Sequence, residues 1–310
     1  MGSPPRPPEV AAREDPAEAG DFAVSALGAD GRIQVLAART TGLCESARRR
    51  HDLWPTAAAA VGRVATATAL LALPLKDGGS VTVSLSGGGP LGGLVAAARP
   101  DGEVRAYALE PHVDLPPRAD GKLDVGGAVG RQGLLRVTKD LGLQRPYVGT
   151  CPLVSGEIGD DFTAYLLRSE QVPGLVALGV LVGAGARVRS AGGLMVQLLP
   201  GAPDDAPERL EANVAALGAV SRAIDAGRRP EELALAVLQG YAPRILARIP
   251  LRFRCRCSRA RLRRVLAGLP PGELRAMREE DGQAEVVCRF CARRYRFGAE
   301  ELRALEAAHG

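Results

Sequence analysis

Four cysteines near the C-terminus carry the clearest chemistry in this sequence. They form two close pairs, Cys255 with Cys257 and Cys288 with Cys291, with thirty residues between the pairs. Two thiol pairs held apart by such a spacer can converge on one tetrahedral zinc ion, and four thiolates complete its coordination without another ligand. The sequence therefore predicts one Zn²⁺ per chain in the reduced state, bound by these four cysteines.

The two pairs differ in spacing. Cys288 and Cys291 lie in a run that predicts a β-hairpin whose tight turn, a zinc knuckle, carries the CxxC. Paired zinc ligands are mostly separated by two to four residues, so the single residue between Cys255 and Cys257 is unusual. It places both thiols on the same side of an extended segment, close enough for oxidation to join them. The spacing alone fits either a structural zinc site or a redox site.

Two features favour the redox interpretation. Each pair can close a disulfide by itself, 255–257 and 288–291, and oxidation would then release the metal. Structural zinc contributes roughly 10–16 kcal/mol in small peptide domains, against a total domain stability of about 5–15 kcal/mol, so a module that loses its zinc should unfold. Nearby cations also favour the reactive thiolate, and seven arginines flank the thiols: Arg252, Arg254, Arg256, Arg259, Arg289, Arg293 and Arg294.

At these residues the sequence resembles a known family. The runs Cys255-Arg-Cys257-Ser258, Glu280 to Cys291 and Tyr295-Arg-Phe297 are similar to the zinc region of the 33-kilodalton heat-shock protein family, and the similarity extends over roughly residues 21 to 305. The resemblance implies a redox-regulated, ATP-independent holdase chaperone and not an enzyme. It implies that the reduced, zinc-bound form is inactive, and that oxidants such as peroxide or hypochlorite form both disulfides and release zinc. The active homodimer would bind partly unfolded client proteins and prevent their aggregation under oxidative stress.

The charge distribution raises alternatives. The net charge is +5, and residues 251–310 carry 14 arginines and no lysine against 8 acidic residues. A zinc-ribbon protein that binds nucleic acid would use such arginines on phosphates; we expect them instead to tune the thiols and to face solvent, so no nucleic-acid partner is predicted. A thiol-disulfide oxidoreductase usually carries its CxxC near a βαβ pattern, whereas here a hairpin is predicted.

The chain of 310 residues is 46% hydrophobic, which permits a sizeable core and more than one domain. Apolar runs stay well short of about eighteen residues, the length typical of a membrane span, and no apolar signal region follows Met1. Six cysteines without an export signal indicate reduced or metal-bound thiols. We therefore expect a cytoplasmic protein without a membrane partner.

The sequence pattern divides the chain into four parts. Residues 1–20, rich in Pro, Ala and Glu, predict a disordered extension. Residues 21–200 predict an α+β core domain of mixed sheets and helices. Residues 201–250 predict a metastable helical linker, and residues 251–310 predict a small zinc domain that acts as the redox switch.

The linker carries two runs at helical spacing, Leu210 to Ile224 and Leu233 to Tyr241. Isolated helices of this length are marginal in water, so they must dock on a neighbour. They could form an ordinary connector. We expect instead that they undock when the zinc domain melts, and that their apolar face and the sheet beneath form the client-binding patch.

Three further features lie in the predicted core domain. Asp30-Gly31 between alternating apolar runs predicts a hairpin, and Ala57 to Leu73 predicts an alanine-rich helix. Gly87 to Gly92 has GxGxxG spacing, but a turn follows too soon for a helix, so we expect a loop between strands. Cys44 and Cys151 stand far apart and are predicted to be inert core thiols.

Overall fold

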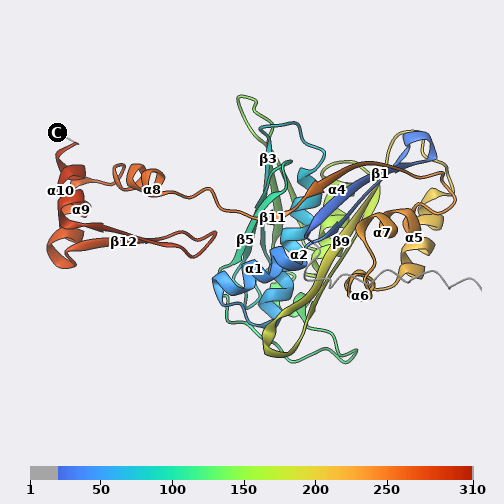
Figure 1. The fold of residues 1–310 in the computed structure, drawn as a ribbon, viewed down its shortest axis with the longest axis horizontal. Helices are drawn as coiled ribbons and strands as arrows, with labels where there is room; N and C mark the ends of the chain where they lie inside the picture. Colours follow the sequence, from blue (N-terminus) through green and yellow to red (C-terminus); the bar gives the residue numbers. More distant parts are fainter. Residues whose placement is uncertain (1–19, 309–310) are drawn as a thin grey trace, which may run out of the picture.

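The computed structural model describes residues 20–308. The predicted disordered extension, residues 1–20, lies outside this range except for its last residue. Figure 1 shows a body of two sheets with helices, and a C-terminal module that projects from it. We call residues 251–308 the C-terminal module and the preceding residues the body.

The first sheet has five antiparallel strands in the order β10-β1-β2-β9-β8. The predicted hairpin around Asp30-Gly31 joins β1 to β2 and is confirmed. Asp30 itself adopts a left-handed conformation with φ of 52°, which Asp tolerates better than most residues. The strands are β1 (Phe22–Gly28), β2 (Ile33–Arg39), β8 (Gly174–Val182), β9 (Val188–Leu198) and β10 (Arg244–Pro250).

The second sheet has six strands in the order β11-β5-β4-β3-β6-β7. Its edge strand β11 is only two residues long and runs parallel to β5, while the other neighbours are antiparallel. The chain enters the module through β11. The strands are β3 (Ser80–Ser86), β4 (Leu94–Ala98), β5 (Glu103–Ala108), β6 (Leu134–Asp140), β7 (Tyr147–Pro152) and β11 (Arg252–Phe253).

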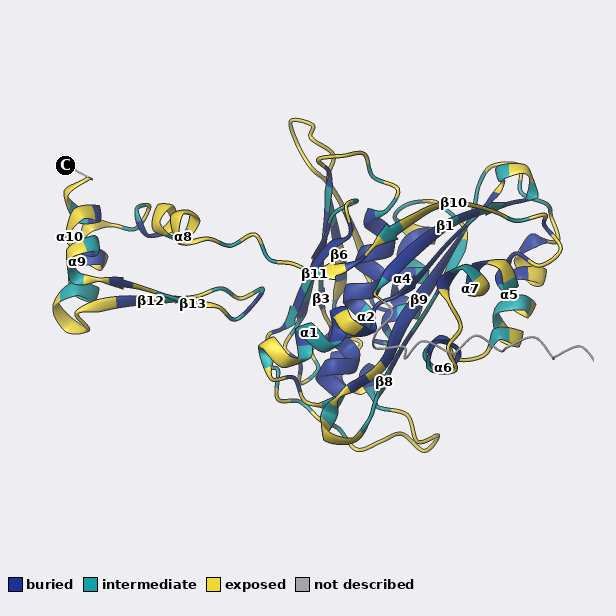
Figure 2. Ribbon diagram, viewed as in Figure 1, coloured by how far each residue is buried: buried dark blue, intermediate teal, exposed yellow. Residues whose placement is uncertain are grey.

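Helix α2 (Pro55–Ala72) fills the space between the two sheets and contacts strands of both. Its alanines let it approach the strands closely, and the predicted helix from Ala57 to Leu73 is confirmed with a slightly earlier start. The helix is long and apolar enough to span a membrane, but 89% of that stretch is buried inside the fold, as a core helix would be. Figure 2 shows the buried residues concentrated on this helix and the strands beside it. Three more helices complete this core: α1 (Thr41–His51), α3 (Val125–Val129) and α4 (Ile158–Arg168).

The glycine-rich run between β3 and β4 is a loop, as predicted. A Cβ atom on Gly87 would lie 2.4 Å from the carbonyl oxygen of Gly130, and one on Gly89 would lie 2.4 Å from that of Ala128. These glycines are therefore required because the loop backbone lies directly against α3. A strand and not a helix follows the loop.

Three helices cover the outer face of the first sheet: α5 (Ala206–Leu217), α6 (Val220–Asp225) and α7 (Pro230–Val237). Helices were predicted here, but Gly218, with φ of 72°, divides the first predicted run into α5 and α6. The prediction of helical structure up to residue 250 is wrong for its last part. Residues 244–250 form β10, which pairs with β1 at the sheet edge.

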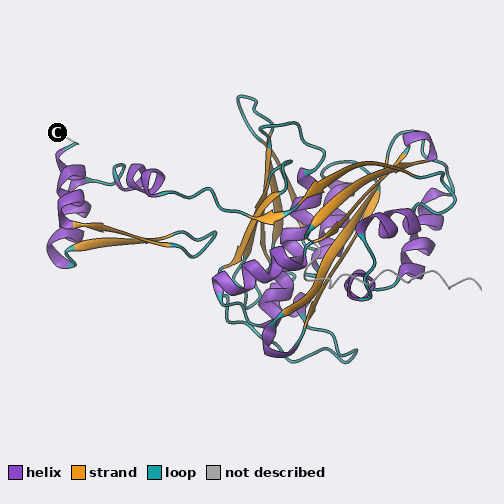
Figure 3. Ribbon diagram, in the orientation of Figure 1, coloured by secondary structure: helices purple, strands orange, loops and turns teal. Residues whose placement is uncertain are grey.

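The C-terminal module is a hairpin with three helices (Figure 3). Its buried core holds only six apolar side chains: Leu266, Leu274, Ala284, Phe297, Leu302 and Leu305. So small a core gives limited stability without a metal or another cross-link. The elements are α8 (Arg259–Leu266), α9 (Pro271–Glu280), β12 (Gln283–Val287), β13 (Arg294–Gly298) and α10 (Ala299–Ala307).

Candidate metal centre

The four predicted ligand cysteines come together at the end of the module that faces the body. All four Sγ atoms lie within 4.8 Å of one another. The Sγ atoms of Cys255 and Cys288 are 3.7 Å apart, and those of Cys257 and Cys291 are 3.3 Å apart. Tetrahedral zinc with Zn–S bonds of about 2.3 Å places its sulfurs about 3.8 Å from one another. The cluster of free thiols can therefore hold one zinc ion without rearrangement of the chain.

The turn between β12 and β13 positions the second pair, which confirms the predicted hairpin with its CxxC. The amide nitrogens of Cys291 and Ala292 both donate to the carbonyl oxygen of Cys288, at 3.2 and 2.8 Å. Ala292 accepts a left-handed conformation, φ 56°, to close the turn. The backbone N–H groups of Phe290 and Arg293 point at the two sulfurs and favour their ionised form. This geometry presents two thiols to one ion.

The first pair lies on the extended segment between β11 and α8. Ser258 directly follows it, and the Ser258 hydroxyl caps α8 by accepting from the Arg261 amide. This cap fixes the end of the extended segment, so that Cys255 and Cys257 reach the hairpin turn.

The thiols of the cluster ionise differently. Burial opposes ionisation of Cys257, but hydrogen bonds from the Tyr295 hydroxyl, 3.2 Å from Cys257 Sγ, and from the other three thiols lower its pKa to about 7. Burial raises the pKa of Cys288 and of Cys291. In this arrangement of thiols Cys257 therefore reaches the thiolate form, which reacts with oxidants, more readily than Cys288 or Cys291.

Most of the flanking arginines form ion pairs with carboxylates, which weakens the effect on the thiols that the sequence predicts. Five of the seven pair with carboxylates: Arg252, Arg254 and Arg256 with Glu103, Arg259 with Glu301, and Arg294 with Glu285. Arg293 does interact with Tyr295 and with two of the thiols. A further arginine, Arg105 on β5, lies with Nη1 3.9 Å from Cys255 Sγ.

Glu103, at the start of β5, joins the module to the body. It is only 5% exposed. Its carboxylate accepts from Arg252 Nη2 at 3.2 Å and from Arg256 Nε at 2.5 Å, and it lies 3.3 Å from Arg254 Nε. The hydrogen bond from Arg256, followed by that from Arg252, holds the pKa of Glu103 below its usual range despite burial. We call these four residues the Glu103 cluster.

Phe290, inside the CxxC, makes a second contact with the body. The Arg105 guanidinium lies over its ring at 4.2 Å, and Tyr107 meets it edge-on with the ring centroids 5.2 Å apart. Its carbonyl oxygen accepts from His51 Nε2 at 3.2 Å. The turn that carries two of the cysteines therefore touches both β5 and α1.

Sequence reasoning missed the body side of this junction. Glu103, Arg105 and Tyr107 alternate along β5, a pattern typical of one exposed strand face. Nothing in the sequence connects this strand with cysteines about 150 residues later. Tyr295 directly follows Arg294 on β13, and its place in the predicted hairpin was the signal that could have found it.

The remaining two cysteines stay away from the cluster. Cys44 and Cys151 are buried in the core between the sheets. Burial raises the pKa of Cys44 to about 12. Their prediction as core thiols is confirmed.

Comparison with known proteins agrees with this architecture. The family model described as Hsp33 protein matches residues 21–298. The 33 kDa chaperonin of Symbiobacterium thermophilum is 52% identical over 91% of this chain and 96% of that protein. The 33 kDa chaperonin of Bacillus subtilis is 46% identical over 92% and 98%. The crystal structure of the 33 kDa chaperonin from Thermotoga maritima superposes with a TM-score of 0.87 at 33% identity, covering 94% of this chain and 98% of that one.

The fold and the cysteine cluster define a two-sheet α+β protein with an appended thiol module that could hold a metal. With these similarities, the chain belongs to the Hsp33 family. The resemblance and the fold class predicted from the sequence are confirmed. The shared name of the relatives, 33 kDa chaperonin, supports a chaperone function.

Proposed function

We propose that this chain is a redox-regulated, ATP-independent holdase chaperone that is inactive while reduced and zinc-bound. Residues 21–200 would form the chaperone core, residues 201–250 the metastable linker, and residues 251–310 the switch. The observation that carries the proposal is the position of the four-thiol cluster. It lies at the junction of module and body, where its CxxC turn contacts β5 and α1.

Zinc bound by Cys255, Cys257, Cys288 and Cys291 would keep these sulfurs as thiolates and tie the extended segment to the hairpin. This tie matters because the module core holds only six buried apolar side chains. Loss of the metal would therefore unfold the module.

Oxidation removes the thiolates that the metal needs. One thiolate attacks peroxide to give a sulfenic acid and hydroxide, and a second thiolate displaces hydroxide to form the disulfide. Each disulfide consumes one peroxide and passes two electrons to it, so two peroxides convert four thiolates into two disulfides. A disulfide sulfur is no longer an anionic ligand, so the oxidised cysteines would no longer hold a zinc ion.

The proposed disulfides are 255–257 and 288–291. In the zinc-competent fold close sulfur contacts also run across the pairs, from Cys255 to Cys288 at 3.7 Å and from Cys257 to Cys291 at 3.3 Å. Once the module opens, the entropy of loop closure favours short loops over loops of about thirty residues. Support for the within-pair disulfides therefore comes from the short sequence separation.

Strand β10 would couple the release of the module to the helices of the linker. This strand lies between α7 and the module, and most of its residues are exposed. The module is held to the second sheet by β11, by the Glu103 cluster, by the contacts of Phe290, and by those of Arg256 with Asp101 and Arg105 with Cys255. Helix α5 is also weakly anchored, because two of its twelve residues are buried. Weakly buried elements open locally at low cost.

Under α5, α6 and α7 lies the surface that would receive clients. Strands β1, β2 and β9 present an apolar face there that includes Phe22, Val24, Val35, Leu194 and Val196. When the helices undock, this face and the helices' own leucines and valines form a continuous apolar patch, which suits partly unfolded proteins. The same patch would support the homodimer that we expect in the activated form, in the cytoplasm.

Hydrogen exchange before and after peroxide tests this proposal. Oxidation should abolish amide protection in the module and in residues 206–237, while β8 and β9 stay protected. Added client should then restore protection on the outer face of the first sheet. Unchanged linker protection in a sample that already suppresses client aggregation would contradict the proposed binding surface.

A further inference from the structure

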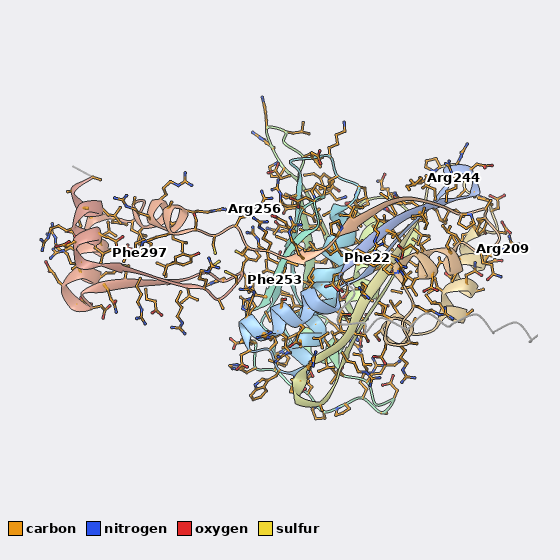
Figure 4. The ribbon with its side chains drawn as sticks, viewed as in Figure 1. Phe22, Arg209, Arg244, Phe253, Arg256 and Phe297 are labelled. Carbon is orange, nitrogen blue, oxygen red and sulfur yellow. The ribbon has the colours of Figure 1, made fainter. Side chains whose placement is uncertain are left out.

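A cavity of about 120 Å³ lies at the junction of the module and the second sheet. Its lining includes five arginines and one carboxylate: Arg99, Arg105, Arg254, Arg256, Arg261 and Glu103. Figure 4 shows Arg256 on the connection where the chain leaves the body. Two of the arginines belong to the body and three to the module.

The charges around this cavity are unbalanced. Guanidinium groups stay protonated in proteins, so five positive side chains face a single carboxylate in the lining. Like charges gathered around one cavity repel one another, although solvent screens part of this repulsion at the exposed arginines of the module. A bound anion would remove this repulsion.

The arginines also keep many hydrogen-bond donors. Each guanidinium has five N–H donors. Arg99 donates one to the Gly78 carbonyl oxygen, and Arg256 donates one to Glu103 and one to Asp101. The Arg261 side chain makes no hydrogen bond or ion pair with any residue from 20 to 308. Donors from both parts of the chain therefore remain for a ligand.

The floor of the cavity adds neutral donors. Ser80 and Thr82 on β3 line it with their hydroxyl-bearing side chains. Neither hydroxyl bonds to another side chain or carbonyl in the part of the chain that the structure describes. Arginine forks together with hydroxyls are the donor set that recognises tetrahedral oxyanions.

We propose that this cavity binds one small oxyanion of the phosphate type. Its volume is well above the roughly 10–15 Å³ that a single water needs, but below the roughly 300 Å³ at which pockets for drug-sized ligands begin. The size therefore suits inorganic phosphate, whereas a whole nucleotide would extend out of the cavity.

The oxyanion would bridge the two parts of the chain. Arg99 and Arg105 come from the body, whereas Arg254, Arg256 and Arg261 come from the module. A ligand that needs both sets binds only the docked arrangement and stabilises it by linkage. This inference concerns the reduced protein and does not depend on chaperone activity.

Calorimetric titration of the reduced, zinc-loaded full chain with inorganic phosphate at constant ionic strength tests the site. We expect one phosphate per chain. Arg99→Gln and Arg261→Gln should each weaken binding about tenfold or more, because each removes a hydrogen bond between charged groups. The matched control is Arg303→Gln on α10, at the end of the module far from the body (Figure 1), which should bind like the wild type.

Absence of phosphate binding would overturn the proposal. An equal loss of phosphate affinity in Arg303→Gln would also overturn it, because it would indicate general attraction to a basic surface. Binding of polyphosphate or single-stranded RNA without binding of phosphate would also overturn it, in favour of an extended polyanion surface. Saturating phosphate should slow amide exchange in residues 252–266; if exchange is unchanged although phosphate binds, the bridging role is wrong.

Discussion

The Glu103→Gln substitution tests how the module is held to the body. Glutamine preserves the shape of the side chain but removes the negative charge that Arg252, Arg254 and Arg256 share. We expect zinc to stay bound in this variant while the module undocks from the body more often.

The expected size of the effect follows from the contacts. The hydrogen bonds from Arg252 and Arg256 lose the charge on their acceptor, although the donors stay charged, and we take the loss for each bond as about 1 kcal/mol. The carboxylate is buried, but the three arginine side chains are 47–59% exposed, so solvent screens part of this energy. We expect a loss of about 1–2 kcal/mol, which raises the undocked population about 5- to 30-fold.

Limited trypsin digestion of the reduced, zinc-loaded protein measures that population. The arginines of the Glu103 cluster are themselves cleavage sites, and cleavage tracks the open population when reclosing is fast. The matched control is Glu285→Gln, because Glu285 pairs with Arg294 and Arg296 inside one hairpin and not across the junction. The role of Glu103 at the junction would be refuted if Glu103→Gln were cleaved at the wild-type rate, or if both variants were cleaved equally faster than the wild type.

Three other substitutions test the four-cysteine cluster and its immediate contacts. Phe290→Ala should leave one zinc per chain but raise the same cleavage rate about fivefold, because aromatic and cation–π contacts contribute about 1 kcal/mol; an unchanged rate would contradict the Phe290 contact. Cys288→Ser should weaken zinc binding on the order of a hundredfold, because it removes one of four thiolates and so about a quarter of the binding energy. Chelator competition measures this affinity, and full zinc affinity in the variant would exclude this ligand set. Tyr295→Phe removes a hydrogen bond that stabilises the Cys257 thiolate, so the pKa of Cys257 should rise above about 7. Directly after a chelator removes the metal, while the module is still folded, Cys257 should then be alkylated more slowly at pH 7, and an identical pH–rate profile would rule out this role.

Local signals made much of the fold predictable. The turn residues Asp30-Gly31 mark the β1–β2 hairpin, the alanine-rich run marks α2, and the CxxC lies in the turn of β12 and β13. Each of these elements is determined by residues close together in sequence.

Elements held by distant partners were not predictable in this way. Helix α1 has no apolar periodicity in its run of arginines, and the residue that caps it, Asp21, lies twenty positions before it and accepts from the amides of Gly42 and Leu43. Strand β10 forms because β1 offers a free edge. No feature of residues 244–250 predicts this pairing.

The candidate site likewise has a part that could be predicted from the sequence and a part that could not. Spacing identified the four cysteines, because closely spaced cysteine pairs are typical of structural zinc sites. The junction with the body could not be found, because Arg252 and Glu103 are 149 residues apart. The carboxylates that pair with most of the flanking arginines could not be found either, because they lie on other elements.

The most direct test of the proposed switch follows zinc, thiols and client protection in the same samples. Peroxide at elevated temperature should release one zinc per chain as four thiols disappear, and suppression of client aggregation, measured by light scattering, should rise in step. If zinc stays bound, or leaves without any gain in client protection, the cysteine cluster is structural and the redox account is wrong.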